Sequence, residues 1–227
     1  MTALLSARGL KKIYRRGAEA VRAVDGVSLD VNSGEMLAVT GPSGSGKTTL
    51  MNILGCLDNP DEGFLSVGGR EIFGSGKKLP EGRLTLLRRK TFGYIFQKFY
   101  LVPTLTVLEN VMLPQVFYKS GSLRKTPMEL LKQLGLEQRA EHLPGQLSGG
   151  EMQRAAIARA LINNPAAVLA DEPTGNLDSA RAQEIKDIMR SLAGEGIAVV
   201  MVTHNPDLAK AADKIIEIRD GKIQPAA

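Results

Sequence analysis

"GPSGSGKT", residues 41–48, is the stretch that decides the fold. It matches the pattern G-x-x-x-x-G-K-[ST], in which a glycine-rich loop joins a buried strand to a helix. The preceding residues 36–40 form a short apolar run typical of a strand, and the residues after Thr48 have helical apolar spacing as far as about Leu54. The stretch therefore predicts a phosphate-binding loop between a strand and a helix of an α/β protein.

The residue types in this loop suit a polyphosphate ligand. Its glycines let backbone N–H groups turn toward an anion, and the dipole of the following helix favours negative charge. Lys47 offers a point charge to the β- and γ-phosphates, and the Thr48 hydroxyl can bind Mg²⁺. The expected phosphate-binding residues are Gly41, Pro42, Ser43, Gly44, Ser45, Gly46, Lys47, Thr48 and Thr49.

Two carboxylates and a histidine follow later apolar runs. Asp171 ends the run "AAVLA" and Glu172 comes next, so both are expected at the carboxyl edge of a parallel sheet. Asp171 would hold Mg²⁺ through water, and Glu172 would polarise the attacking water as a general base. His204 follows "IAVVMVT" and would hydrogen-bond the γ-phosphate at the same edge, whereas His142 lies in a polar segment and is expected on the surface.

The order of expected elements gives the fold class. Strands near residues 4–10 and 27–31, and a small pair in "GFLSVGG" and "REIFG", make an antiparallel beginning. From about residue 79 to 146 the pattern is mainly helical, and strands and helices then alternate to a final strand pair in "KIIEIRDGKI". We expect an α/β phosphate-loop core with a mixed or parallel sheet and a small antiparallel subdomain. A helical subdomain, about residues 98–163, lies within a single domain, 1–227.

Composition excludes several classes of protein. The 227 residues are 43% hydrophobic and 23% charged, as in ordinary globular domains, and runs such as residues 197–202 are far shorter than the roughly 20 apolar residues of a membrane helix. The first residues do not form a signal peptide, which predicts a cytosolic site. The single cysteine, Cys56, excludes an internal disulfide and a Cys-rich zinc site, and we expect it buried in the helix after the phosphate loop.

A second glycine turn lies in "QLSGGEMQRAAIARAL", residues 146–161. Ser148, Gly149 and Gly150 precede a run with helical apolar spacing, so the stretch predicts a tight turn that opens a helix. Free N–H groups at such a helix start could bind an anion. One bound nucleotide does not need two phosphate sites, however, so this turn requires another explanation.

In their order along the chain, these motifs resemble those of the ATP-binding subunits of ABC transporters, and the likeness covers almost all 227 residues. "GPSGSGKTT" resembles the Walker A loop, "AVLADE" the Walker B strand and "LSGGE" the signature motif. "FQK" places Gln97 in the Q-loop, "GNLD" places Asp178 in the D-loop, and "THN" makes His204 the switch histidine. Tyr14 matches the aromatic residue that stacks on adenine.

The resemblance implies a head-to-tail dimer in which the signature of one copy closes over ATP held by the Walker A loop of the other. Ser148, Gly149 and Gly150 would then contact the γ-phosphate of the partner's ATP, and Asp178 would join the binding site. The implied cofactors are ATP and Mg²⁺. The catalytic residues would be Glu172, His204 and Gln97, and the metal ligands Thr48, Gln97 and Asp171.

"LADEPTGNLD" and "FQKFYLVPTLTVLENV" resemble the lipoprotein-release and macrolide-exporter group, whose members act with a membrane permease. The resemblance implies a peripheral subunit on the cytoplasmic face of the bacterial inner membrane, with residues 96–118 forming part of the groove for the permease's coupling helix. Only 23 residues follow His204, which favours a subunit without a C-terminal regulatory domain.

Three alternatives fit less of the sequence. An importer ATPase shares the main motifs. An ABC ATPase acting on DNA usually separates Walker A from Walker B by long coiled coils or zinc-bearing insertions, whereas Lys47 and Asp171 are 124 residues apart without heptads. A metabolite kinase does not explain "LSGGE". The net charge of +5 is scattered and only 4% of residues are aromatic, so no direct nucleic-acid partner is expected.

Overall fold

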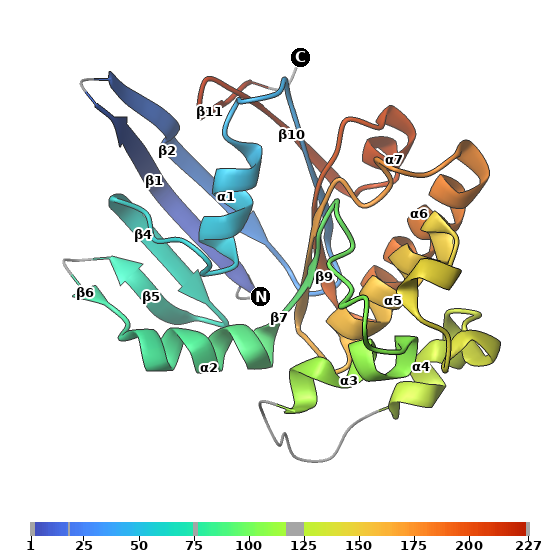
Figure 1. The fold of residues 1–227 in the computed structure, drawn as a ribbon. Coiled ribbons are helices and arrows are strands. Elements are labelled where there is room, and N and C mark those ends of the chain that lie inside the picture. Colours follow the sequence, from blue (N-terminus) through green and yellow to red (C-terminus); the bar gives the residue numbers. More distant parts are fainter. Residues whose placement is uncertain (1–2, 18, 75–76, 117–124, 226–227) are drawn as a thin grey trace.

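The computed structural model describes residues 3–17, 19–74, 77–116 and 125–225. Strands of these residues form two sheets, and helices pack between and beside them (Figure 1). The antiparallel sheet has the order β2 (Glu19–Val31), β1 (Leu5–Arg16), β4 (Glu62–Val67), β5 (Arg70–Gly74) and β6 (Lys77–Lys78). The main sheet has the order β11 (Lys222–Ile223), β10 (Lys214–Arg219), β3 (Met36–Thr40), β9 (Ala198–Val202), β8 (Ala167–Asp171) and β7 (Phe92–Ile95).

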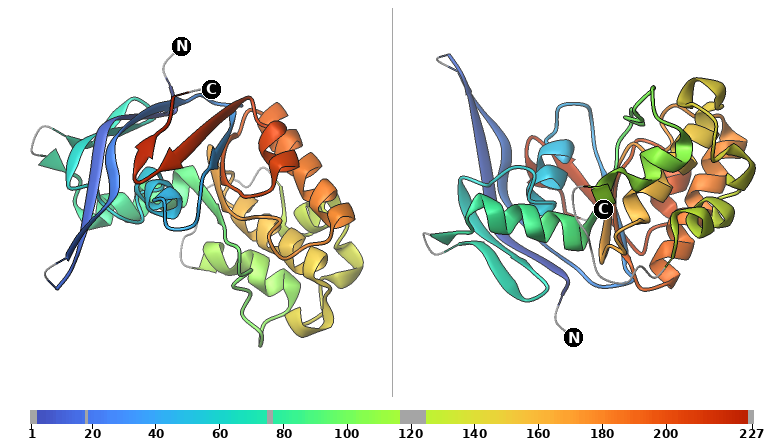
Figure 2. Two further views of the ribbon diagram at one scale, coloured as in Figure 1. Left: turned by 90° about the horizontal axis from the view of Figure 1, so that it is seen from above. Right: turned by 60° about the horizontal axis from the view of Figure 1, so that its bottom comes forward.

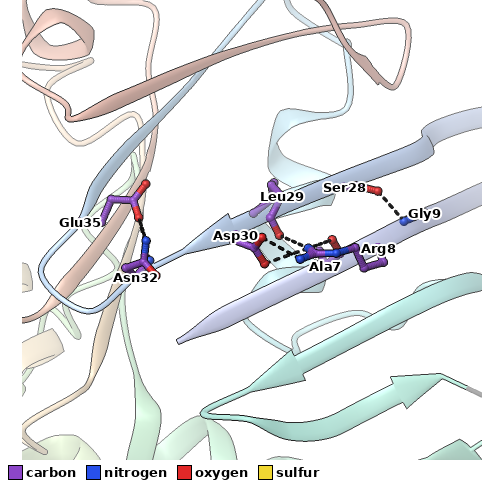
Figure 3. A network of polar contacts seen from close by, with 8 residues as sticks. All are labelled: Ala7, Arg8, Gly9, Ser28, Leu29, Asp30, Asn32 and Glu35. Atoms are coloured by element: carbon purple, nitrogen blue, oxygen red, sulfur yellow. Dashed lines mark hydrogen bonds and ion pairs between the residues drawn. The ribbon is translucent and has the colours of Figure 1, made fainter. Parts of the chain in front are cut away.

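The β1–β2 hairpin is longer than the sequence pattern predicts. It continues to the pair Arg16 and Glu19, although the tip lacks apolar alternation. The register between β1 and β2 shifts after Ala7. At this irregularity the N–H of Gly9 donates to the Ser28 hydroxyl at 2.8 Å. Beside this irregularity, the Arg8 guanidinium donates to both carboxylate oxygens of Asp30, at 2.8 and 2.7 Å (Figure 3). Hydrogen bonds of this kind stabilise a polar ribbon that hydrophobic periodicity does not reveal.

The main sheet carries the phosphate loop. Neighbouring strands from β10 to β7 pair in parallel, and β11 returns antiparallel beside β10. The central strands are apolar on both faces, as expected for a parallel sheet covered on both sides. The predicted α/β fold class, with a mixed sheet and an antiparallel subdomain, is confirmed.

The helices are distributed over the two faces of the main sheet. Helix α1 (Lys47–Leu54) lies between the two sheets, as Figures 1 and 2 show, and shares one core with Leu37, Leu169 and Val200. The opposite face, which includes Val168 and Met201, packs against helices of the second core. Those helices are α3 (Val107–Val116), α4 (Pro127–Gln133), α5 (Gly149–Leu161), α6 (Ser179–Gly194) and α7 (Pro206–Lys210), with the 3₁₀ turns η1 (Glu137–Arg139) and η2 (Pro144–Gln146).

The prediction of a mainly helical stretch from about residue 79 to 146 is wrong in one place. Strand β7 begins directly after α2 (Glu81–Thr91) and forms the edge of the main sheet through parallel pairing with β8. Helix α2 itself belongs with the antiparallel side, where Leu84 joins the core that contains α1. Residues 117–124 of this stretch lie outside the described residues. The single domain, 1–227, and the helical subdomain, about 98–163, stay predictions.

Cys56 is buried, but it lies two residues beyond the end of α1 rather than in that helix. Burial raises the pKa of its thiol to about 12, so the thiol stays protonated at neutral pH. None of the helices in the described ranges combines the length and the apolar character that a membrane crossing requires.

Candidate functional site: a nucleotide pocket at the phosphate loop

The phosphate loop is folded tightly against two distant parts of the chain. Gly46 has φ +105°, and a Cβ atom there would lie 1.9 Å from the carbonyl oxygen of Ala23 in β2. Gly41 has φ +133°, and a Cβ there would lie 2.0 Å from the carbonyl oxygen of Ile218 in β10. Only glycine fits both the backbone conformation and the space at these positions.

Lys47 is placed at the start of α1 with its charge nearly out of solvent. The side chain is 6% exposed, and Nζ donates to the carbonyl oxygens of Gly41 at 2.9 Å and Pro42 at 2.7 Å. Burial lowers the pKa of Lys47, while the negative charges of Glu172 and Asp171 act in the opposite direction. The loop thus holds a desolvated cation, which favours an anionic ligand.

The N-terminus of α1 has the features of an anion site. Its N-cap, Gly46, is left-handed and provides no side-chain cap, and its first turn contains no acidic residue. The first backbone N–H groups of a helix lack partners within the helix, and the helix dipole makes this end positive. A phosphate can therefore accept the hydrogen bonds that a capping side chain would otherwise accept.

The two carboxylates lie opposite this helix start. Asp171, at the end of β8, receives a hydrogen bond from the Thr48 hydroxyl at 3.3 Å. Its pKa is raised by burial, against the opposing effects of Thr48 and the Lys47 charge. Glu172 has φ +47°, and its carboxylate accepts from the backbone N–H of His204 at 3.2 Å. His204 Nε2 lies 3.2 Å from Glu172 Oε1, so two of the three predicted catalytic side chains meet.

One cavity of about 600 Å³ collects most of the predicted site residues. It is lined by Tyr14, Ser43, Gly44, Gly46, Lys47, Thr48, Thr49, Gln97, Asp171, Glu172 and His204, and also by Ala23, Gly175 and Val202. Gly41, Pro42 and Ser45 belong to the loop but do not line the cavity. The sequence does not predict the last three of these residues, Ala23, Gly175 and Val202, because a lone alanine, glycine or valine carries no sign that it faces a ligand.

Two weaker motif residues also face this cavity. Tyr14 lies on β1 and is 43% exposed, with its hydroxyl bonded to Asp58 at 2.7 Å. Gln97 follows β7, and its backbone carbonyl accepts from the Asn176 side chain at 2.9 Å. The edge strand that the sequence pattern did not reveal is therefore the element that brings Gln97 to the site.

The signature turn and Asp178 do not line the cavity. Ser148 is the N-cap of α5: its hydroxyl accepts from the N–H of Glu151 at 3.3 Å, and Glu151 accepts from the N–H of Ser148 at 2.8 Å. Arg139 donates to the same carboxylate at 2.9 Å. Asp178 similarly caps α6 through the N–H of Arg181. The sequence signal for the first cap is S-x-x-E, residues 148–151.

The donor set at the phosphate loop fits Mg²⁺. The Thr48 hydroxyl and the Asp171 carboxylate are oxygen donors that already face each other, and the Gln97 side chain lines the same cavity. Throughout the described ranges, no three His, Cys, Asp or Glu side chains gather as a metal site by themselves. Mg²⁺ typically takes one or two protein oxygens and completes its shell with phosphate and water, so this sparse set is sufficient.

Comparisons with known proteins agree with this geometry. The family model described as "ABC transporter" matches residues 24–175. The macrolide export ATP-binding/permease protein MacB of Shigella flexneri is 48% identical over 98% of this chain, and that of Photorhabdus laumondii is 45% identical over 98%. The chain spans 34% of the length of each of these relatives.

Solved structures resemble the whole fold. The ATP-binding cassette MJ0796, in a dimeric post-hydrolysis state bound to ADP and Pi, matches with a TM-score of 0.87 and 40% identity over 97% of both chains. A second dimeric structure of MJ0796, described as a bacterial ABC transporter cassette, gives a TM-score of 0.86. Given the family match and these relatives, the chain belongs to the ABC transporter family.

Proposed function

We propose that this chain binds and hydrolyses ATP with Mg²⁺ and thereby drives a membrane permease. The observation that carries the proposal is the single cavity in which a phosphate loop, a metal-binding pair and a carboxylate–histidine pair meet. Each of these groups suits one part of phosphoryl transfer to water: binding the charge, placing the metal and orienting the nucleophile.

The residues divide this work by position. Lys47 and the uncapped start of α1 bind the β- and γ-phosphates, and Thr48, Asp171 and Gln97 would hold Mg²⁺. When bound, Mg²⁺ neutralises charge on the phosphates. Glu172 accepts a proton from the attacking water, and His204, held at 3.2 Å from it, donates to the γ-phosphate.

We further propose that the site is completed by a second copy of the chain. Ser148, Gly149 and Gly150 lie outside the cavity of their own chain, as does Asp178. In a head-to-tail dimer they would close over the nucleotide of the partner copy. The dimeric MJ0796 structures, at 40% identity, support this arrangement. Hydrolysis would remove the γ-phosphate that joins the two copies, and the dimer would open.

The proposed permease partner would dock on a second cavity, of about 380 Å³, between β7 and the helices. Phe96 and Pro114 of the predicted docking segment, 96–118, line it together with Phe92 and Arg159, while residues 117–118 lie outside the described residues. An aromatic groove with arginines suits an apolar helix with an acidic residue. The relatives named macrolide export ATP-binding/permease proteins support the macrolide-export side of the predicted lipoprotein-release and macrolide-exporter group, and association with a membrane. We place the chain peripherally, at the cytoplasmic face of the bacterial inner membrane.

The central test is Glu172→Gln, which keeps the size of the side chain but removes its basicity. We expect ATP hydrolysis to fall by roughly 10²–10⁴-fold, the usual contribution of a general base. Because the γ-phosphate then persists, the variant should form a dimer at saturating Mg-ATP, measured by size-exclusion chromatography with light scattering. A variant that remains monomeric there would contradict the dimer mechanism.

A second variant tests the signature turn. Ser148→Arg places a long charged side chain at the start of α5, outside the cavity of its own chain. We expect hydrolysis to be lost while nucleotide binding by the monomer stays unchanged, as measured by fluorescent ADP titration. Loss of nucleotide binding by the monomer would show that the signature acts on the site of its own chain.

A further inference from the structure

The Tyr14 side chain contacts a charged pair, Lys12 and Asp58, that belongs to none of the predicted motifs. Its hydroxyl donates to Asp58 Oδ2 at 2.7 Å. Lys12 Nζ donates to the other oxygen of the same carboxylate, at 2.8 Å, and to the carbonyl oxygen of Asn59, at 2.7 Å. The Lys12 and Asp58 side chains are only 13% and 30% exposed, so water screens this pair less than an ordinary surface ion pair.

The same lysine also lies over the tyrosine ring. Lys12 Nζ is 5.3 Å from the ring centroid of Tyr14, within the range of a cation–π contact. Tyr14 lines the nucleotide cavity and Lys12 does not. The lysine therefore supports the ring from outside the cavity, and the ring contributes to the cavity wall.

Asp58 links this support to the phosphate-binding helix. The N–H groups of Leu57 and Asp58 both donate to the carbonyl oxygen of Asn52, within α1, at 2.8 and 3.2 Å. A third contact to β1, from the N–H of Ile13 to Asp61 at 2.7 Å, holds the following turn. Because α1 begins at the phosphate loop, the position of the Tyr14 ring is fixed relative to the phosphates as well as to its own strand.

We propose that Asp58 and Lys12 are positioning residues that hold the Tyr14 ring as a preformed stacking platform for the purine base of the nucleotide. This inference rests on the proposed nucleotide function and on stacking by Tyr14. A ring whose hydroxyl is hydrogen-bonded to Asp58 and whose face is contacted by Lys12 loses less rotational freedom on binding. This improves affinity without any direct contact of Asp58 with the ligand.

The protonation states agree with this arrangement. Burial acts to raise the pKa of Asp58, but hydrogen bonds from Lys12 and Tyr14 outweigh it, and the pKa is lowered. Burial and the hydrogen bond to Asp58 raise the pKa of Tyr14. At neutral pH the carboxylate is thus ionised and the phenol is protonated, as the hydrogen bond requires.

The test compares a ligand that has a base with one that has none. Dissociation constants of ADP and of inorganic pyrophosphate are measured by competition with a fluorescent ADP, using the full chain. We expect Asp58→Ala and Tyr14→Phe each to weaken ADP binding by about two- to tenfold, the usual cost of ordering one side chain. The double variant should be no weaker than Asp58→Ala alone, because Asp58→Ala already removes the hydrogen bond that Tyr14→Phe removes. Pyrophosphate binding should stay unchanged in all three.

Control variants distinguish a failure of the positioning role from a failure of stacking by Tyr14. Glu62→Gln breaks the exposed Lys11–Glu62 ion pair on the same strand pair, without contact to Tyr14, and should alter neither ligand. If Asp58→Ala does not fold, Tyr14→Phe takes its place, because it removes the same hydrogen bond from the other partner, and unchanged ADP affinity in that variant would then overturn the positioning role. Unchanged ADP affinity in the Asp58 variant, or an equal loss for pyrophosphate, would overturn the positioning role. If Tyr14→Ala leaves ADP binding unchanged, stacking itself is wrong, and with it that part of the proposed function.

Discussion

The phosphate loop and the signature turn are both glycine turns at a helix start, yet their helix ends are satisfied in opposite ways. At α1, the N-cap Gly46 has no capping side chain, and Cβ atoms at Gly46 or Gly41 would collide with backbone of β2 or β10. At α5, Ser148 and Glu151 form a capping box. A Cβ at Gly149 would meet nothing nearer than 3.7 Å, and the residue does not have positive φ.

This difference distinguishes two reasons why a position in the chain carries glycine. The packing of their own chain requires the glycines of the phosphate loop. The first backbone N–H groups of α1 have no side-chain cap and can donate to a ligand. Among the described residues, none lies close enough to require glycine at position 149, so a requirement there would come from a surface that approaches from outside. The signature turn, residues 148–150, is thus a helix start that is capped within its own chain and that a second molecule can approach closely.

The largest expected effect is that of Gly46→Ala. The added methyl group would lie 1.9 Å from the Ala23 carbonyl oxygen, at a φ that alanine rarely adopts. Backbone strain and overpacking together predict a loss of roughly 2–5 kcal/mol in the free energy of unfolding, with loss of nucleotide binding. Urea denaturation and ADP titration measure both. Gly82→Ala, in α2, where nothing lies within 4 Å, is the matched control and should not destabilise the chain.

An intermediate effect is expected at the other helix start, from Glu151. Hydrogen bonds from the backbone of Ser148 and from Arg139 lower the pKa of Glu151 from 4.5 to about 2. Because the folded pKa is the lower one, this carboxylate stabilises the fold above about pH 4.5, and that contribution is lost as the pH falls toward about 2.

Glu151→Gln keeps a capping side chain but removes the charge. At pH 7 it should lower the free energy of unfolding by roughly 0.3–1 kcal/mol, the usual value of a negative charge at a helix N-terminus, and the difference from the natural chain should shrink at pH 3. Urea denaturation at both pH values gives the answer. Glu141→Gln, at an exposed position, controls for the loss of one charge. A difference independent of pH would contradict the assigned pKa.

The smallest effect on folding is expected from Gly149→Ala, which should change the free energy of unfolding by less than about 0.5 kcal/mol. Nucleotide binding by the monomer should also be unchanged, whereas ATP hydrolysis should fall, because the added methyl group occupies space meant for the partner's nucleotide. Steady-state hydrolysis and urea denaturation distinguish these quantities. Hydrolysis at the natural rate would remove the proposed distinction between the two turns.

Much of the fold follows from the sequence, because the strands of the main sheet are short apolar runs and the phosphate loop fixes where one of them ends. Strand β7 did not follow, since it begins directly after α2 without a turn residue and its partner, β8, lies more than 70 residues later. The long β1–β2 hairpin was also missed because its outer part, which continues to the pair Arg16 and Glu19, lacks apolar alternation.

The candidate site was predictable where a residue type carries its own chemistry. Lys47 is part of the phosphate-loop pattern at a helix start, whereas Asp171, Glu172 and His204 are titratable residues at or just after strand ends. The structure brings all four to one cavity. Asp58 could not be found in this way. An aspartate in a loop after a helix is ordinary, and only the folded contact with Tyr14 gives it a place near the nucleotide.

The residues that pack against the phosphate loop have a consequence for how the molecule folds. Gly46 packs against Ala23, Gly41 against Ile218, and the carbonyl oxygen of Ser45 accepts from the N–H of Gly221. The contacts with Ile218 and Gly221 join residues far apart in the sequence, and we expect them to form late, because closing a long loop of chain is entropically unfavourable. Without β10 the phosphate loop lacks its packing partner Ile218. We therefore expect nucleotide affinity to report whether β10 has joined the main sheet.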